Sequence, residues 1–198
     1  MCLIIAKPTG IEFTESLLSD FLDATTYNPD GFGLAMVSKG KVVVKVAMAV
    51  DELCLDTYLD TSQAMVLHAR FATNGDKTLD NCHPFKINGY AIAHNGIIDK
   101  PYMDYALSDT KQYIQQELQH YIPRLNVDLS LQHRIERDLG AYNKIVILDK
   151  YDNIRIINEP SGHWSNGVWF SSPSAPTVWE YAWDYTQWEL EDLEAWSR

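Results

Sequence analysis

The sequence predicts a mixed α+β domain built in layers. Strand-like runs in the first half of the chain are followed by a pair of amphipathic helices, and further strand-like runs come after them. With 46% hydrophobic residues, the 198-residue chain has enough apolar surface for a sizeable core, which excludes a wholly disordered protein. This length suits one ordinary globular domain with a short appendage.

The first half of the chain alternates strand patterns with two short helices. Phe13–Ala24 has apolar residues at helical spacing, with Thr14 as a plausible N-cap. Asn28–Gly31 is turn chemistry, because Pro fixes φ and Gly accepts a positive φ. A short helix is expected over Asp51–Leu59. The expected strands are Met1–Ala6, Phe32–Ser38, Val42–Val50, Gln63–Phe71 and Tyr90–Ile98.

The second half begins with the helical pair. Ser108 is the expected N-cap of a helix that runs through Tyr121, with Pro123 just beyond its end. A second helix is expected over Leu129–Leu139, stopping at Gly140. The remaining expected strands are Lys144–Leu148, Ile154–Ile157 and Val168–Ser171.

Charge and composition exclude several function classes. The formal net charge of −11 repels phosphate backbones and anionic lipid, so neither nucleic acid nor a membrane is an expected partner. The longest apolar runs fall far short of the ~20 residues that a membrane span needs, and no signal-peptide pattern is present. Three cysteines are too few for a disulfide framework and favour a reducing compartment. We therefore expect a cytoplasmic protein.

The C-terminal end differs in composition from the rest of the chain. All six tryptophans lie between Trp164 and Trp196, and the segment from Trp179 onward carries six acidic residues and one basic residue. We therefore expect a domain over residues 1–175 and an acidic, Trp-rich tail over 176–198. The tail is expected to pack on its own domain, and anchoring at an interface is the alternative.

Cys2 is a candidate nucleophile because of its place in the chain. Removal of the initiator Met before so small a residue leaves Cys2 with a thiol and a free α-amine on one carbon skeleton. An α-amine has a pKa of ~7.7–8.0, so it can act as the general base for the neighbouring thiol. Taken alone, Cys2 is better explained as a small buried residue in a terminal strand.

Three polar motifs follow predicted strands or begin a helix. Arg70 ends an apolar strand and has a guanidinium suited to a carboxylate, with Thr73 beside it. The Asn95 amide and the Gly96 N–H are a plausible pair of oxyanion donors, although Asn-Gly is also a common hairpin turn. Asp109 favours the helix dipole and could also hold an ammonium group.

Taken in order, these motifs resemble a known family. The chain has Cys2, Asp-Gly-Phe-Gly near residue 30, His-x-Arg-x-Ala-Thr-x-Gly over His68–Gly75, His-Pro-Phe, His-Asn-Gly over His94–Gly96, and Ser-Asp-Thr. Together they resemble the class II glutamine amidotransferases of the N-terminal nucleophile hydrolase superfamily, in particular the small stand-alone members. The resemblance runs from Cys2 to about Ser172 and implies a four-layer αββα sandwich of two mainly antiparallel sheets flanked by helices.

The resemblance also implies a role for each motif. Cys2 would attack the glutamine side-chain amide with its α-amine as base, and Asn95 and Gly96 would form the oxyanion hole. Arg70 would bind the α-carboxylate with help from Thr73, and Asp109 would hold the α-ammonium group. The family's sugar-synthase members usually read His-Thr-Arg-Trp-Ala-Thr-His-Gly, and here Ala69, Phe71 and Asn74 replace three of those residues. His83, in the His-Pro-Phe motif, is expected near the glutamine-binding pocket.

Hydrolysis of glutamine to glutamate and ammonia through a Cys2 thioester is therefore the leading functional hypothesis. No cofactor is implied, and the spacing of Cys82, His83, His68 and His94 matches no zinc pattern. The ammonia is expected to pass to an unidentified acceptor or a partner synthase, and the expected protein partners are such a synthase or further copies of this chain. The alternatives are a hydrolase for another γ-glutamyl or small amide, and a non-catalytic binding or regulatory domain with the same fold.

Overall fold

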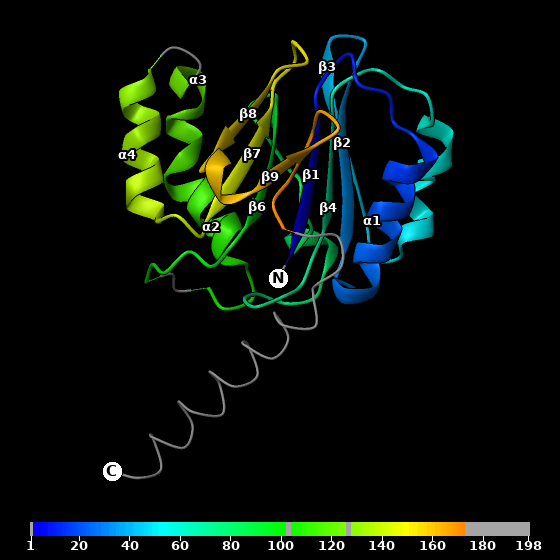
Figure 1. The fold of residues 1–198 in the computed structure, drawn as a ribbon. Coiled ribbons are helices and arrows are strands. Elements are labelled where there is room, and N and C mark those ends of the chain that lie inside the picture. The colour runs from blue at the N-terminus through cyan, green and yellow to red at the C-terminus, as the bar shows by residue number, and fades with distance from the viewer. Residues whose placement is uncertain (1, 102–103, 126–127, 173–198) are drawn as a thin grey trace.

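Two antiparallel sheets lie face to face, with helices on both outer surfaces (Figure 1). The computed structural model describes residues 2–101, 104–125 and 128–172. Within them, no helix is long and apolar enough to cross a membrane. The predicted α+β class and the four-layer αββα order are thereby confirmed. The predicted 176–198 tail lies outside the described residues, so its packing stays a prediction.

The first sheet has six strands in the order β3-β2-β4-β1-β10-β9. All of its pairings are antiparallel. The central strand β1 lies between β4 and β10, and every one of its five residues is buried. The strands are β1 (Leu3–Lys7), β2 (Phe32–Ser38), β3 (Lys41–Ala47), β4 (Met65–Ala69), β9 (His163–Ser165) and β10 (Val168–Phe170).

The second sheet has four strands in the order β5-β6-β7-β8. Helix α1 covers the outer face of the first sheet, and α2 to α4 cover the outer face of the second (Figure 1). The strands are β5 (Phe85–Ile87), β6 (Tyr90–Asn95), β7 (Lys144–Leu148) and β8 (Ile154–Ile157). The helices are α1 (Glu15–Tyr27), α2 (Asp109–Gln116), α3 (Ile122–Leu125) and α4 (Leu129–Leu139).

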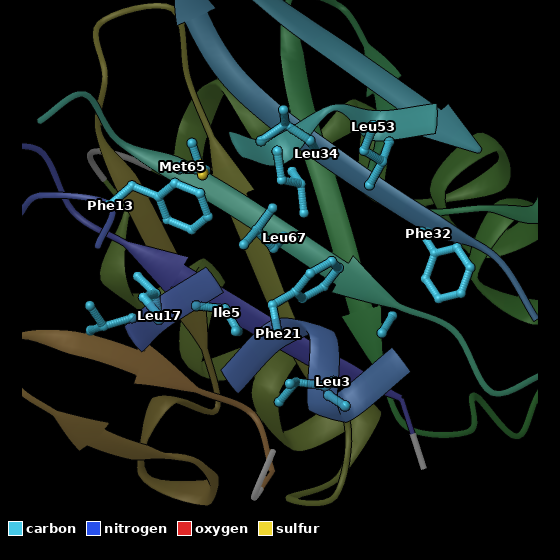
Figure 2. Packing of buried hydrophobic residues seen from close by; sticks show 14 of the residues in the cluster. Leu3, Ile5, Phe13, Leu17, Phe21, Phe32, Leu34, Leu53, Met65 and Leu67 are labelled. Atoms are coloured by element: carbon cyan, nitrogen blue, oxygen red, sulfur yellow. The ribbon is translucent and has the colours of Figure 1, made fainter. Parts of the chain in front are cut away.

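Three hydrophobic clusters fill the spaces between the layers. Because successive side chains of a strand point to opposite faces, Leu3 and Ile5 of β1 pack toward α1, while Ile4 and Ala6 pack toward the second sheet. Figure 2 shows the cluster under α1, where Phe21 packs over the strands of the first sheet. A third cluster lies between the second sheet and α2 to α4.

Several predicted elements have the expected bounds. Strand β2, helix α4, β7 and β8 match residue for residue. The Thr14 hydroxyl accepts a hydrogen bond from the Leu17 N–H at 3.2 Å, so Thr14 is the N-cap of α1 as predicted. The hairpin alternative for Asn95-Gly96 is wrong, because β6 pairs with β5 and β7 and the chain continues after Gly96 into the loop before α2.

Two predicted helices are broken. The expected helix over Asp51–Leu59 is a pair of short 3₁₀ turns, because Cys54 between them has a left-handed backbone with a φ of 53°. The expected helix through Tyr121 ends at Gln116 and is followed by a 3₁₀ turn and α3. Pro123 lies in the first turn of α3, a position that needs no N–H donor.

Lys7 ends β1 at the opposite end from Cys2. It is only 1% exposed, and its ammonium group donates to the backbone carbonyls of Ile11, at 2.6 Å, and of Gln63. Burial lowers the pKa of this amine to about 8, against a smaller opposite effect from the Asp152 carboxylate. The Lys7 ammonium group therefore holds two loop carbonyls at a cost in desolvation.

Candidate active site

The predicted site residues come from four elements that end or begin at the same end of the sandwich. Cys2 precedes β1 and Arg70 follows β4, and these two strands are antiparallel with Leu3 opposite Ala69. The pairing therefore brings Cys2 and Arg70 to the same end of two adjacent strands in the middle of the first sheet. Asn95 is the last residue of β6 in the second sheet, and Asp109 is the first residue of α2.

Five of the six predicted site residues line one pocket. These are Cys2, Arg70, Thr73, Gly96 and Asp109. The pocket is completed by Phe71, Asn74, His83, His94, Ser108 and Thr110. The prediction that His83 lies near the pocket is thus confirmed. A thiol, a guanidinium and a carboxylate meet in this one cavity, although they are up to 107 residues apart in the sequence.

The Cys2 thiol is half-buried and bound to the backbone of Phe71. The Phe71 N–H donates to Sγ at 3.3 Å, and the thiol can donate to the Phe71 carbonyl at 3.4 Å. Burial raises the pKa of the thiol, and the Phe71 contact only partly offsets this effect. At neutral pH the sulfur is therefore protonated, and it needs a base before it can act as a nucleophile.

Asn95 joins the two sheets beside the thiol. Its side-chain NH₂ donates to the Cys2 carbonyl at 2.7 Å and to the Ser171 hydroxyl at 2.8 Å. The Ser172 hydroxyl donates to the same Cys2 carbonyl at 3.0 Å, and the Ser171 hydroxyl accepts from the Ile4 N–H at 2.8 Å. The start of β1 is consequently fixed from both sheets.

The Arg70 guanidinium is held by a loop. Only 3% of the residue is exposed, and its nitrogens donate to the carbonyls of Asn74 at 2.9 Å and Asp76 at 3.0 Å. Neutral carbonyls orient the guanidinium without cancelling its charge. A buried cation in this setting is well placed to bind an anion in the pocket.

The Asp109 carboxylate begins α2 and also fixes the loop after β6. Its Oδ2 accepts from the Ile98 N–H at 2.7 Å, and its Oδ1 accepts from the Thr110 N–H at 2.6 Å. The preceding Ser108 is the N-cap, as predicted, and its hydroxyl accepts from the Lys111 N–H at 3.2 Å. Asp109 therefore offers a negative charge to the pocket on a rigid helix start.

His94, in β6, connects α2 to the loop between α4 and β7. The Asn143 amide nitrogen donates to the Leu139 carbonyl at 2.6 Å, so its oxygen faces His94 and must accept from His94 Nε2, at 2.9 Å. Nδ1 is then the acceptor for the Thr110 hydroxyl at 2.7 Å. Burial lowers the pKa of His94, which fits this neutral tautomer.

His83, which lines the pocket, contacts the buried His68. His83 Nδ1 is 3.0 Å from His68 Nε2, and both atoms are within 3.2 Å of the His94 carbonyl oxygen. Burial lowers the pKa of His68 to about 3 and that of His83 well below its usual value, so both rings are neutral. The sequence motifs include these histidines but do not indicate that they contact one another.

The four-layer sandwich is the arrangement implied by the resemblance to class II glutamine amidotransferases. No family model matches the chain. A glutamine–fructose-6-phosphate aminotransferase of Photorhabdus laumondii is 29% identical over 180 residues, covering 82% of this chain and 29% of that protein. The protein of the same name from Shewanella oneidensis is 27% identical over 177 residues, with the same two coverages.

These relatives confirm the resemblance, and the chain spans about three-tenths of their length. Among solved structures, a glutamine phosphoribosylpyrophosphate amidotransferase from B. subtilis covers 86% of this chain and 41% of its own, with 12% identity and a TM-score of 0.49. A glutamine aminotransferase class-II domain protein from Silicibacter pomeroyi covers 86% and 87%, with 13% identity and a TM-score of 0.41.

Proposed function

We propose that this domain hydrolyses the side-chain amide of glutamine to glutamate and ammonia through a thioester on Cys2. The observation that carries the proposal is the shared pocket, in which a thiol lies with a buried guanidinium and a carboxylate. Glutamine has a carboxylate and an ammonium group at one end and the scissile amide at the other. The pocket offers a complementary group for each.

Three residues bind the α-amino acid end of glutamine. Arg70 binds the α-carboxylate, since its guanidinium is already oriented by the Asn74 and Asp76 carbonyls. Thr73 assists from the same loop, and Asp109 binds the α-ammonium group. These contacts hold the side-chain amide near Cys2, which converts a bimolecular attack into a reaction of a fixed pair.

The proton balance of the reaction requires a free α-amine on Cys2. Because burial keeps the thiol protonated, the amine takes its proton as the sulfur attacks the amide carbon. The amine then gives this proton to the departing nitrogen, so ammonia leaves and the γ-glutamyl thioester remains. Water attacks the thioester with the amine again as base, which releases glutamate and restores the thiol.

Asn95 and Gly96 stabilise the oxyanion of the tetrahedral intermediates. Both Asn95 amide hydrogens are engaged in the structure, with the Cys2 carbonyl and the Ser171 hydroxyl. In the reaction Asn95 therefore has to redirect one hydrogen toward the substrate, while the Gly96 N–H supplies the second donor. Loss of one such donor typically costs ~10²–10³ in kcat.

The ammonia acceptor is a partner of this domain. The chain covers only about three-tenths of the aminotransferases that it resembles, whose names include a sugar phosphate acceptor. We propose that a partner synthase receives the ammonia, and a homo-oligomer of this chain is the alternative assembly. Affinity capture that returns only this chain would weigh against the synthase and favour the homo-oligomer.

The deciding experiment is a glutaminase assay on protein whose intact mass shows that Met1 is removed. We expect glutamate release from the parent protein and none above background from Cys2→Ala, while Cys54→Ala, which removes an exposed thiol outside the pocket, keeps full activity. A glutamine-mimicking diazoketone should add one covalent label, at Cys2. A folded, processed protein that neither releases glutamate nor accepts the label contradicts the proposal and favours a non-catalytic binding domain.

Substrate class is tested separately with glutamine derivatives whose α-carboxylate is blocked. If Arg70 binds a free carboxylate, these derivatives should be hydrolysed far more slowly than glutamine. Equal or faster hydrolysis of the blocked compounds would replace glutamine with another small amide as the substrate.

A further inference from the structure

Asn81 is a fully buried amide outside the predicted site. It ends a short 3₁₀ turn at Leu79–Asn81, and 0% of the residue is exposed. Its NH₂ donates to the carbonyls of Asp76 at 3.0 Å and Ala106 at 2.7 Å, and its oxygen accepts from the Ser108 N–H at 2.9 Å. One side chain thus bonds to two loops that are about 30 residues apart in the sequence.

These two loops carry the charged groups proposed to bind the substrate's α-amino acid end. The Asp76 carbonyl that accepts from Asn81 also accepts from Arg70 Nη1 at 3.0 Å. Ser108, whose N–H donates to Asn81, is the N-cap residue immediately before Asp109. The Asn81 side chain therefore bonds directly to the loop that orients Arg70. It also bonds to the backbone of Ser108, the residue before Asp109.

The contact between the loops is tight as well as polar. The Asp76 N–H donates directly to the Ala106 carbonyl at 3.0 Å. Gly75 has a φ of +74°, and a Cβ built on it would lie 2.5 Å from the backbone nitrogen of Ser108. Since no side chain fits between the loops at this point, their separation is set by backbone contact and by the Asn81 amide.

We propose that Asn81 is a positioning residue that fixes the separation of the Arg70 guanidinium and the Asp109 carboxylate. It thereby makes the pocket select amides that carry both an α-carboxylate and an α-ammonium group. This inference rests on the proposed function. When the distance between Arg70 and Asp109 is fixed, one ligand can bind both charged groups at once. When the contact between the two loops is loosened, a ligand can still bind either group but seldom binds both together.

The test compares four amides that differ only in the charged groups at one end. Glutamine has both groups, glutaramate lacks the ammonium group, 4-aminobutanamide lacks the carboxylate, and butanamide lacks both. Each is assayed for kcat/KM, and a slow substrate is assayed as a competitive inhibitor of glutamine hydrolysis. The proteins are the parent chain and Asn81→Ala, with Asn153→Ala as the matched control.

Asn153 suits the control because its amide binds Asp149 in the turn between β7 and β8, away from the residues that line the pocket. We expect Asn81→Ala to lower kcat/KM for glutamine roughly 10- to 100-fold and that for either singly charged amide by less than about 3-fold. Alkylation of Cys2 by iodoacetamide should keep its rate, because the thiol is held by Phe71. Asn153→Ala should leave all four substrates unchanged.

An equal loss for all four amides overturns the inference, because it indicates damage to the whole site. If Asn81→Ala is insoluble, Gly75→Ala and Asn81→Ser disturb the same junction, and both must show the selective loss for glutamine. A parent protein that hydrolyses no amide instead contradicts the proposed function. An unchanged glutamine preference in a folded Asn81 variant contradicts the positioning role alone.

Discussion

Replacing Lys7 with Met should change how the stability of the fold depends on pH. Burial lowers the pKa of the Lys7 amine from 10.5 to about 8. Below pH 8 the amine is charged in both the folded and the unfolded chain, and the folded state bears the full cost of burying that charge. Between pH 8 and 10.5 the folded chain has released this proton and the unfolded chain still binds it, so the free energy of unfolding rises with pH.

The size of the effect follows from the two pKa values. A tenfold change in proton affinity corresponds to about 1.36 kcal/mol, which gives a rise of about 2.5 kcal/mol between pH 7 and pH 10 from Lys7 alone. Lys7→Met removes this contribution but keeps every other titrating group. The difference in unfolding free energy between the parent protein and the variant should therefore shift by about 2.5 kcal/mol in favour of the parent over that range.

Urea denaturation at half-unit pH intervals measures the difference. Lys41→Met is the control, because it removes an exposed lysine from the β2–β3 hairpin. It measures the effect on stability of losing a positive charge that is not buried. A difference between parent and Lys7→Met that stays flat from pH 7 to 10 would refute the reasoning. It would mean that the hydrogen bonds to the Ile11 and Gln63 carbonyls fully offset the desolvation cost of the ammonium group.

Three other substitutions, two of them paired with a control substitution, test the site and the core. Arg70→Lys keeps the charge but loses the planar fork, so KM for glutamine should rise roughly 10- to 100-fold in a steady-state assay. Gly96→Ala places a Cβ 2.3 Å from a buried amide oxygen at a φ of +146°, and should cost about 2–4 kcal/mol in urea denaturation. Gly89→Ala, at a φ of +82° with no described atom within 4 Å of the new Cβ, should cost about 1 kcal/mol. Phe21→Ala empties the centre of the cluster under α1 and should cost about 3–5 kcal/mol, whereas Leu22→Ala, at a residue that is 41% exposed, should cost under about 1 kcal/mol.

Elements with strong local signals were predictable from the sequence. Helix α4 has apolar residues at helical spacing and stops at Gly140, whose φ of +78° other residues seldom adopt. Strands β5 and β9 have three residues each, too few to show a period, so their formation depends on pairing with β6 and β10. The break at Cys54 is likewise invisible in a sequence window, because cysteine has no special preference for a positive φ.

The candidate site was predictable as a set of residues but not as a geometry. Cys2, Arg70 and Asp109 were selected by residue type and order, and their meeting in one pocket depends on strand register between distant segments. Asn81 belongs to the motif that ends in His-Pro-Phe, but nothing in that motif indicates which groups its side chain contacts. Its importance follows only from complete burial and from three partners that the fold brings to it.

The position of β1 has a consequence for how the protein is made on the ribosome. The strand next to Cys2 has β4 on one side and β10 on the other, with Ile5 opposite Phe170. A nascent chain shorter than about 170 residues therefore exposes β1 as an unpaired edge, which is a template for aggregation. Ser171 and Ser172, which bind Asn95 and the Cys2 carbonyl, are synthesised later still. The contacts of β1 are thus completed only when nearly the last of the described residues have left the ribosome. Chaperones should therefore recognise stalled or truncated chains through β1.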